Sequence, residues 1–167
     1  MRIDLGLITR AWAITGGVIV LSIVFVTSAN VGAFAIDRVA RLYGTTFSAL
    51  PGYEDFVRLA ISSAAMMFFP YCQYQRGHVF VDIISGKMSP RVQRALDRFS
   101  LIGMTAMALF MAYWMLLGML ETRDDHALSR VLGWPEWPFY FPGLLSLILW
   151  AVIAFFQIFE NQDPSDD

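Results

Sequence analysis

The hydrophobic residues of this chain gather in four long runs, and the charged residues are confined to the segments between these runs. Residues 11–36, 59–75, 99–120 and 137–159 contain no Asp, Glu, Lys or Arg. The apolar positions are continuous within each run, whereas a helix at the surface of a soluble domain keeps a polar face. The pattern therefore predicts helices that have no aqueous side over most of their length.

The length of the runs indicates that they cross a membrane. A bilayer core of about 30 Å needs roughly 20 helical residues. Three runs reach this length, and the second reaches it if its first turn, residues 53–58, lies at the interface. The first run far exceeds the apolar core of a signal peptide, so we expect it to be retained. We predict an all-α integral membrane protein, a single domain over residues 1–167, with spans at 11–35, 53–75, 99–120 and 138–159.

The segment between the second and third spans predicts one more helix, over residues 89–98. Ser89 and Pro90 are typical of a helix start. One side of the segment is apolar at helical spacing, with Val92, Ala95, Leu96 and Phe99. The other side carries Arg91, Arg94 and Arg98. This favours an amphipathic interfacial helix whose arginines contact lipid phosphates, although a solvated extension of the third span fits the same residues.

The distribution of Lys and Arg predicts the orientation in the membrane. The N-terminus and the loop between the second and third spans together carry seven of these residues, and the C-terminal tail carries none. The two loops on the opposite side carry four. The positive-inside rule then places both termini in the cytoplasm. Trp134 and Trp137, in an aromatic segment before the fourth span, are expected to anchor the chain in lipid at the external face.

The composition excludes several classes of protein. Of 167 residues, 57% are hydrophobic, which is too many for a disordered chain. Cys72 is the single cysteine, so a disulfide scaffold is ruled out. A net charge of −2 and the lack of a basic, aromatic patch argue against a nucleic-acid partner. Continuous apolar runs argue against an outer-membrane barrel, whose strands alternate.

The candidate chemistry is sparse. Both histidines, His78 and His126, lie outside the predicted spans, and their acidic neighbours form only incomplete metal-binding groups. Autonomous transporters place ionisable residues or broken helices near the middle of the membrane, whereas the polar groups within these spans are uncharged, such as Asn30, Ser62 and Thr105. We therefore predict no catalytic, cofactor or metal site, and favour an accessory subunit. A free-standing four-span carrier or exporter and a membrane enzyme are the alternatives.

The charged residues at the start of the second span have evident pairing. Glu54 and Arg58 are spaced to pair on one side of the first turn, with Asp55 beside them. We expect these residues to fix a helix end or to dock a partner.

Three blocks of residues resemble the small membrane subunit of tripartite ATP-independent periplasmic (TRAP) transporters, the DctQ-like family. The first block is Glu54-x-x-x-Arg58, which opens the second span. The second is the most specific, Arg76-Gly77-His78-Val79-Phe80-Val81-Asp82, just after that span. The third is Leu132-Gly133-Trp134-Pro135-Glu136-Trp137, followed by Tyr140 and Pro142-Gly143. The chain departs from the family late in the second span, where bulky residues 68–72 replace the usual Gly or Ala.

The resemblance implies a bacterial inner-membrane system that imports organic acids with sodium. In such systems a periplasmic binding protein captures the solute, and a large multi-span permease subunit carries the substrate and sodium sites. The small subunit resembles a fixed scaffold that anchors the large subunit among membrane lipids. The residues implied to order helix ends or to contact the large subunit are Glu54, Arg58, Arg76, His78 and Asp82.

Overall fold

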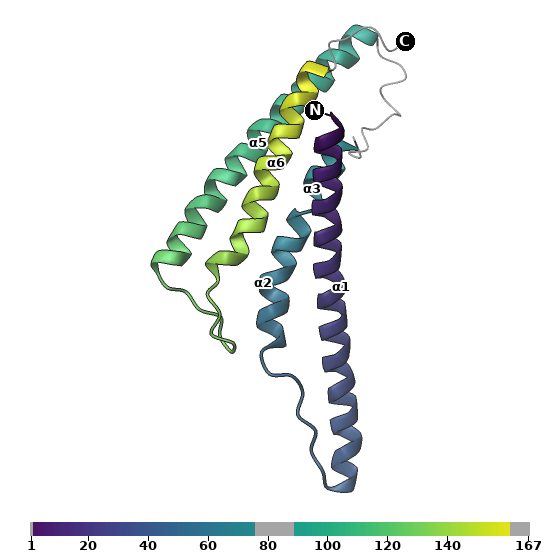
Figure 1. Cartoon of the computed structure of the whole chain (residues 1–167), viewed down its shortest axis with the longest axis vertical. Coiled ribbons are helices and arrows are strands. Elements are labelled where there is room, and N and C mark those ends of the chain that lie inside the picture. Colours follow the sequence, from purple (N-terminus) through teal and green to yellow (C-terminus); the bar gives the residue numbers. More distant parts are fainter. Residues whose placement is uncertain (1, 76–88, 161–167) are drawn as a thin grey trace.

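The computed structural model describes residues 2–75 and 89–160, and these residues fold into helices without a strand (Figure 1). In chain order the elements are α1 (Arg2–Ala40), η1 (Arg41–Tyr43), α2 (Tyr53–Met66), α3 (Phe69–Tyr74), α5 (Pro90–Asp124), η2 (Trp137–Phe139) and α6 (Tyr140–Glu160). Three helical segments are long and apolar enough to cross a membrane: Leu5–Tyr43, Arg91–Asp124 and Trp137–Phe159. They coincide with the first, third and fourth predicted spans.

The second predicted span is not one continuous helix. α2 ends at Met66, and α3 begins at Phe69 after a short turn. Pro70 explains the break, because proline has no N–H to donate and its ring clashes with the carbonyl four residues earlier, that of Met66. The two short helices follow one another along the same neighbours, so together they occupy the place of the predicted span (Figure 1).

The predicted interfacial helix is not a separate element. Ser89 precedes the first residue of α5, so the predicted helix start is right, but its hydroxyl does not cap the helix. From Pro90 the helix continues without interruption to Asp124. Residues 90–98 therefore form the first turns of α5, which matches the alternative of an extension of the third span.

The four helical rods lie in one layer, in the order α5, α6, α2–α3 and α1 (Figure 1). α6 packs against α5 on one side and against α2 and α3 on the other. In the most apolar 18-residue stretch of each long helix, 39% of the α6 stretch is accordingly buried, against 17% of the α1 stretch and 11% of the α5 stretch. The layer leaves two broad faces, and its apolar side chains are largely exposed on them.

α1 contacts the rest of the layer along one narrow line of residues. Four buried residues recur every seven positions, at Thr9, Gly16, Ile23 and Asn30, and Ala33 is buried one turn after the last of them. A seven-residue repeat keeps one line of a helix facing its partner, as in a coiled coil. At Gly16 the approach is close, because a Cβ there would lie 2.9 Å from the Cβ of Met67. The missing side chain of Gly16 thus makes room for the turn between α2 and α3.

The chain that leaves α1 is tied back to the end of this helix. The backbone N–H of Leu50 donates to Asn30 Oδ1 at 3.0 Å, and that of Phe47 donates to Asp37 Oδ1 at 2.9 Å. Arg41 Nε pairs with Asp37 Oδ2 at 2.8 Å. Because Asn30 and Asp37 are two turns apart, the segment runs along one side of α1.

Candidate functional site

The start of α2 is joined to the segment before η2 by a buried carboxylate. Asp55 Oδ2 accepts the backbone N–H of Val131 at 2.7 Å and that of Leu132 at 3.0 Å. The side chain of Asp55 is buried, so these bonds satisfy a charge that would otherwise be costly. Gly52, with φ +79°, allows the approach, because a Cβ there would lie 2.6 Å from Leu132 Cδ2.

An ion pair lies beside this carboxylate. Arg58 Nη2 donates to Glu136 Oε1, across 78 residues of sequence. The sequence allowed Arg58 to pair with Glu54, and this pairing is wrong, because Arg58 reaches the loop instead. Glu54 is exposed and forms no hydrogen bond or ion pair with the residues that the structure describes. We call Asp55, Arg58, Glu136 and the N–H groups of Val131 and Leu132 the charged junction.

A second junction joins α3 to the far end of α6, and the sequence reasoning missed it. Gln73 Nε2 donates to Gln157 Oε1 at 2.7 Å, and Gln157 Nε2 donates to the carbonyl of Gln73 at 2.9 Å. Trp150 Nε1 donates to Gln73 Oε1 at 2.9 Å. Both glutamines are buried. We call these three residues the amide junction. The sequence feature that could have predicted this junction is the presence of two amide side chains inside apolar spans, because such side chains usually bond to another helix.

One side-chain bond links α1 directly to α6. Trp12 Nε1 donates to Ser146 Oγ at 2.8 Å, and Ser146 Oγ donates to the carbonyl of Pro142 at 2.7 Å. This contact connects α1, the outer helix of the layer, directly to α6.

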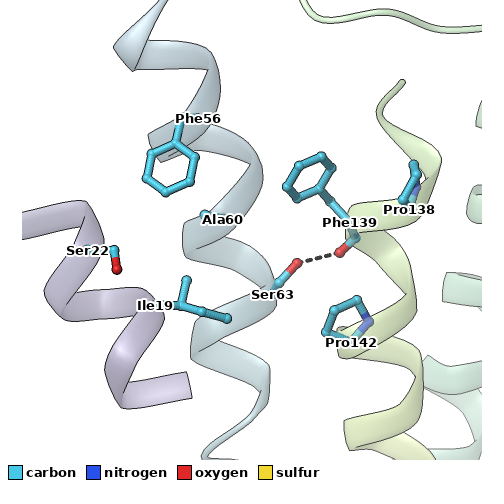
Figure 2. A pocket seen from close by; sticks show the side chains of 8 residues that line it. All are labelled: Ile19, Ser22, Phe56, Ala60, Ser63, Pro138, Phe139 and Pro142. Carbon is cyan, nitrogen blue, oxygen red and sulfur yellow. Dashed lines mark hydrogen bonds between the residues drawn. The ribbon is translucent and has the colours of Figure 1, made fainter. Parts of the chain in front are cut away.

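An apolar pocket of about 430 Å³ lies between α1, α2 and the start of α6 (Figure 2). Its lining comes from three separate parts of the chain: Ile19, Ser22, Phe56, Ala60, Ser63, Pro138, Phe139 and Pro142. Ser63 Oγ donates to the carbonyl of Phe139, which fixes α2 against η2 at the wall of the pocket (Figure 2). The lining is almost wholly apolar, so the pocket has no group suited to a polar solute.

The remaining predicted site residues are distributed around this framework. Arg76, His78 and Asp82 lie outside the described residues. The arginines of the first turns of α5 are exposed: Arg91, Arg94 and Arg98. Trp134 stacks on Phe139 with ring centroids 6.4 Å apart, and the Arg123 guanidinium lies 5.7 Å from the ring centroid of Trp137.

Comparison with known families decides the class of the protein. The family model of the DctQ component of tripartite ATP-independent periplasmic transporters matches residues 34–162. The chain belongs to the DctQ family. This confirms the resemblance inferred from the sequence. The chain is therefore a membrane protein, the small membrane subunit of a TRAP transporter, and its family is one of transporter components and not an enzyme class. No curated protein and no solved structure matches it.

The region that matches the family model contains both junctions. It begins near the end of α1 and includes α2, α3, α5 and α6. The α1 residues that brace the layer or line the pocket, Trp12, Ile19 and Ser22, precede it. The polar contacts between α2–α3 and α6 are thus features of the part of the chain that carries the family signature.

Proposed function

We propose that this subunit is a fixed membrane scaffold for a sodium-coupled importer of organic acids. It would act with a large permease subunit, which holds the substrate and sodium sites, and with a periplasmic binding protein. The assembly would lie in the bacterial inner membrane with both termini of this subunit in the cytoplasm. The DctQ membership supports these partners, because the TRAP systems that the sequence resembles use all three components.

The single-layer arrangement is the observation that carries the scaffold role. A translocation path needs a cavity enclosed by helices, with polar or ionisable groups near the middle of the membrane. Here the helices stand side by side. The buried glutamines bond to each other between α3 and α6, and Ser146 accepts from Trp12 of α1 and donates within α6. A layer with two apolar faces is suited to packing against another membrane subunit and against lipid.

The two junctions support four membrane crossings. The charged junction joins the start of α2 to the segment before α6, and the amide junction joins α3 to the end of α6. α2 and α3 therefore cover the same depth as α6, which is itself long enough to cross a membrane. On this basis we count α2–α3 as a broken span beside α1, α5 and α6.

The first turns of α5 would lie at the cytoplasmic headgroups. Val92, Leu96 and Phe99 expose 47%, 41% and 77% of their surface, so they are accessible to acyl chains. The arginines on the other side suit lipid phosphates. Trp134 and Trp137, each more than one third exposed, would hold the opposite face.

Co-purification and reconstituted uptake test the scaffold role. The full chain should purify in detergent with the large permease subunit, and alone it should move no organic acid into liposomes. Uptake should require the large subunit, the binding protein and a sodium gradient. Uptake by the purified chain alone would instead support the free-standing carrier, and a chain that never associates with the large subunit would refute the proposal.

The charged residues proposed to contact the large subunit are tested together. Alanine at Glu54, Arg58, Arg76, His78 and Asp82 should weaken co-purification and lower uptake. Assembly and uptake at the wild-type level would show that these residues take no part in docking.

A further inference from the structure

We infer that the pocket between α1, α2 and the start of α6 binds one acyl chain of a membrane phospholipid. The half-open pocket of about 430 Å³ has a lining that is almost free of polar surface (Figure 2). Lipid occupancy needs only that the chain is embedded in a bilayer, and it does not depend on the scaffold role or on the transported solute.

The two hydroxyl groups in the lining are already used. Ser22 Oγ donates to the carbonyl of Val18 at 2.9 Å, within its own helix. Ser63 Oγ donates to the carbonyl of Phe139. Both hydroxyl protons are thus used, so the side chains of this lining offer no hydrogen-bond donor, and the two serine oxygens are their only possible acceptors. An anionic occupant would therefore find no side-chain donor, and a water would find fewer partners than it usually has.

The position of the pocket along the helices matches the depth of acyl chains. On α2, Ala60 and Ser63 lie two and five residues after Arg58, about 3–8 Å farther along the helix. On α1, Ile19 lies nine residues from Arg10, about 13 Å, well inside the run that carries no charge. The pocket thus begins just below the interface and reaches toward the middle of the bilayer.

An empty pocket of this size would be unfavourable in a bilayer. The atoms that line a void lose their dispersion contacts on one side, and neighbouring hydrocarbon restores these contacts. Because lipid tails are as apolar as the side chains, van der Waals packing and not the hydrophobic effect would hold the chain in place. The small side chains of Ser22 and Ala60 leave the space that the acyl chain would fill.

Photolabelling in a defined bilayer tests this assignment. The full chain is placed in nanodiscs of phosphatidylethanolamine and phosphatidylglycerol that include a phosphatidylethanolamine with a diazirine on one acyl chain. After illumination, labelled residues are mapped by mass spectrometry. Labelling at Ile19 and Phe56 should exceed that at Phe110, an exposed apolar residue of α5, several-fold. Equal labelling at all three residues of the unsubstituted protein would overturn the proposal.

Two substitutions on different sides of α1 test the assignment further. Ser22→Phe places a ring over the pocket and should lower its labelling several-fold. Ser28→Phe is the matched control, because Ser28 is an exposed serine of the same helix that does not line the pocket. Unchanged labelling in a folded Ser22→Phe protein would contradict the proposal. Crosslinks from the pocket residues to the large subunit, and not to lipid, in the assembled complex would also contradict the proposal.

Discussion

The charged junction and the amide junction hold the same two helical lines together by different chemistry. At the start of α2, the exposed fractions of the Arg58 and Glu136 side chains are 52% and 21%, and Asp55 binds two backbone N–H groups nearby. At the end of α3, Gln73 and Gln157 are buried and neutral. The ion pair is placed where water remains accessible, whereas neutral amides serve where a charge would lose its hydration.

Removal of the Asp55 carboxylate should break the charged junction and have the largest effect. Asp55→Ala leaves the N–H groups of Val131 and Leu132 without their acceptor. Because hydrogen bonds to a charged group contribute about 1.5–3 kcal/mol each, we expect a loss of about 3 kcal/mol in the free energy of unfolding. The measurement is unfolding in detergent, with Glu54→Ala as the control that should change little. A loss as small as that of the control would mean that Asp55 does not hold the loop.

The amide junction should be the next most sensitive. Gln73→Leu removes the acceptor of Trp150 Nε1 and the donor to Gln157 Oε1, so we expect a loss of about 2 kcal/mol. Gln75→Leu is the matched control, since Gln75 is exposed and, within the part of the chain that the structure describes, its amide donates to the hydroxyl of Tyr71 in the same turn.

The double variant at the amide junction separates bonding from packing. Gln73→Leu combined with Gln157→Leu removes both amides, so it should cost less than the sum of the single changes. Strict additivity of the two losses in the same unfolding measurement would show that the glutamines act independently.

The hydrogen bond between Trp12 of α1 and Ser146 of α6 should contribute less to stability than either junction. Trp12→Phe keeps most of the ring but removes the N–H that donates to Ser146, so the expected loss is about 1 kcal/mol. Ser146→Ala should give a similar value, and the double variant should add little to either. A double variant whose loss is the full sum would contradict a direct bond between the two side chains.

The Arg58–Glu136 pair should have the smallest effect on stability. Partly exposed ion pairs contribute about 0.2–1 kcal/mol, and salt screens them. Glu136→Gln should therefore destabilise the protein slightly at low salt and not at all in concentrated salt. A large loss of stability that does not depend on salt would mean that the ion pair is shielded from water like the amide junction. The two junctions would then not differ in their access to water.

The long helices were predictable because lipid leaves the backbone few choices. A charge-free run of more than 20 residues satisfies its N–H and C=O groups as a helix, which is why α1, α5 and α6 match the predicted spans. The break after Met66 was only partly visible, because Pro70 indicates a kink. The close contact of Met67 with Gly16 accompanies the full break, and it joins residues far apart in sequence.

The order of the helices and the partners of the charges could not be read from the sequence. A helix that is apolar on all sides gives no sign of which side packs, so exposed Phe110 and buried Leu147 look alike. Arg58 had a carboxylate four residues away, and local spacing favoured Glu54. The choice of Glu136 depends on the path of the loop between α5 and η2, which local spacing does not describe.

The unequal lengths of α1 and α6 make the layer sensitive to bilayer thickness. The charge-free part of α1 is 26 residues, about 39 Å, whereas that of α6, residues 140–159, is 20 residues, about 30 Å. α1 also extends well past the loop between α5 and η2 (Figure 1). A thin bilayer matches α6 and forces α1 to tilt, and a thicker one lets α1 stand upright while α6 becomes too short. Membrane thickness would thus set the crossing angle between the outer and the central helix.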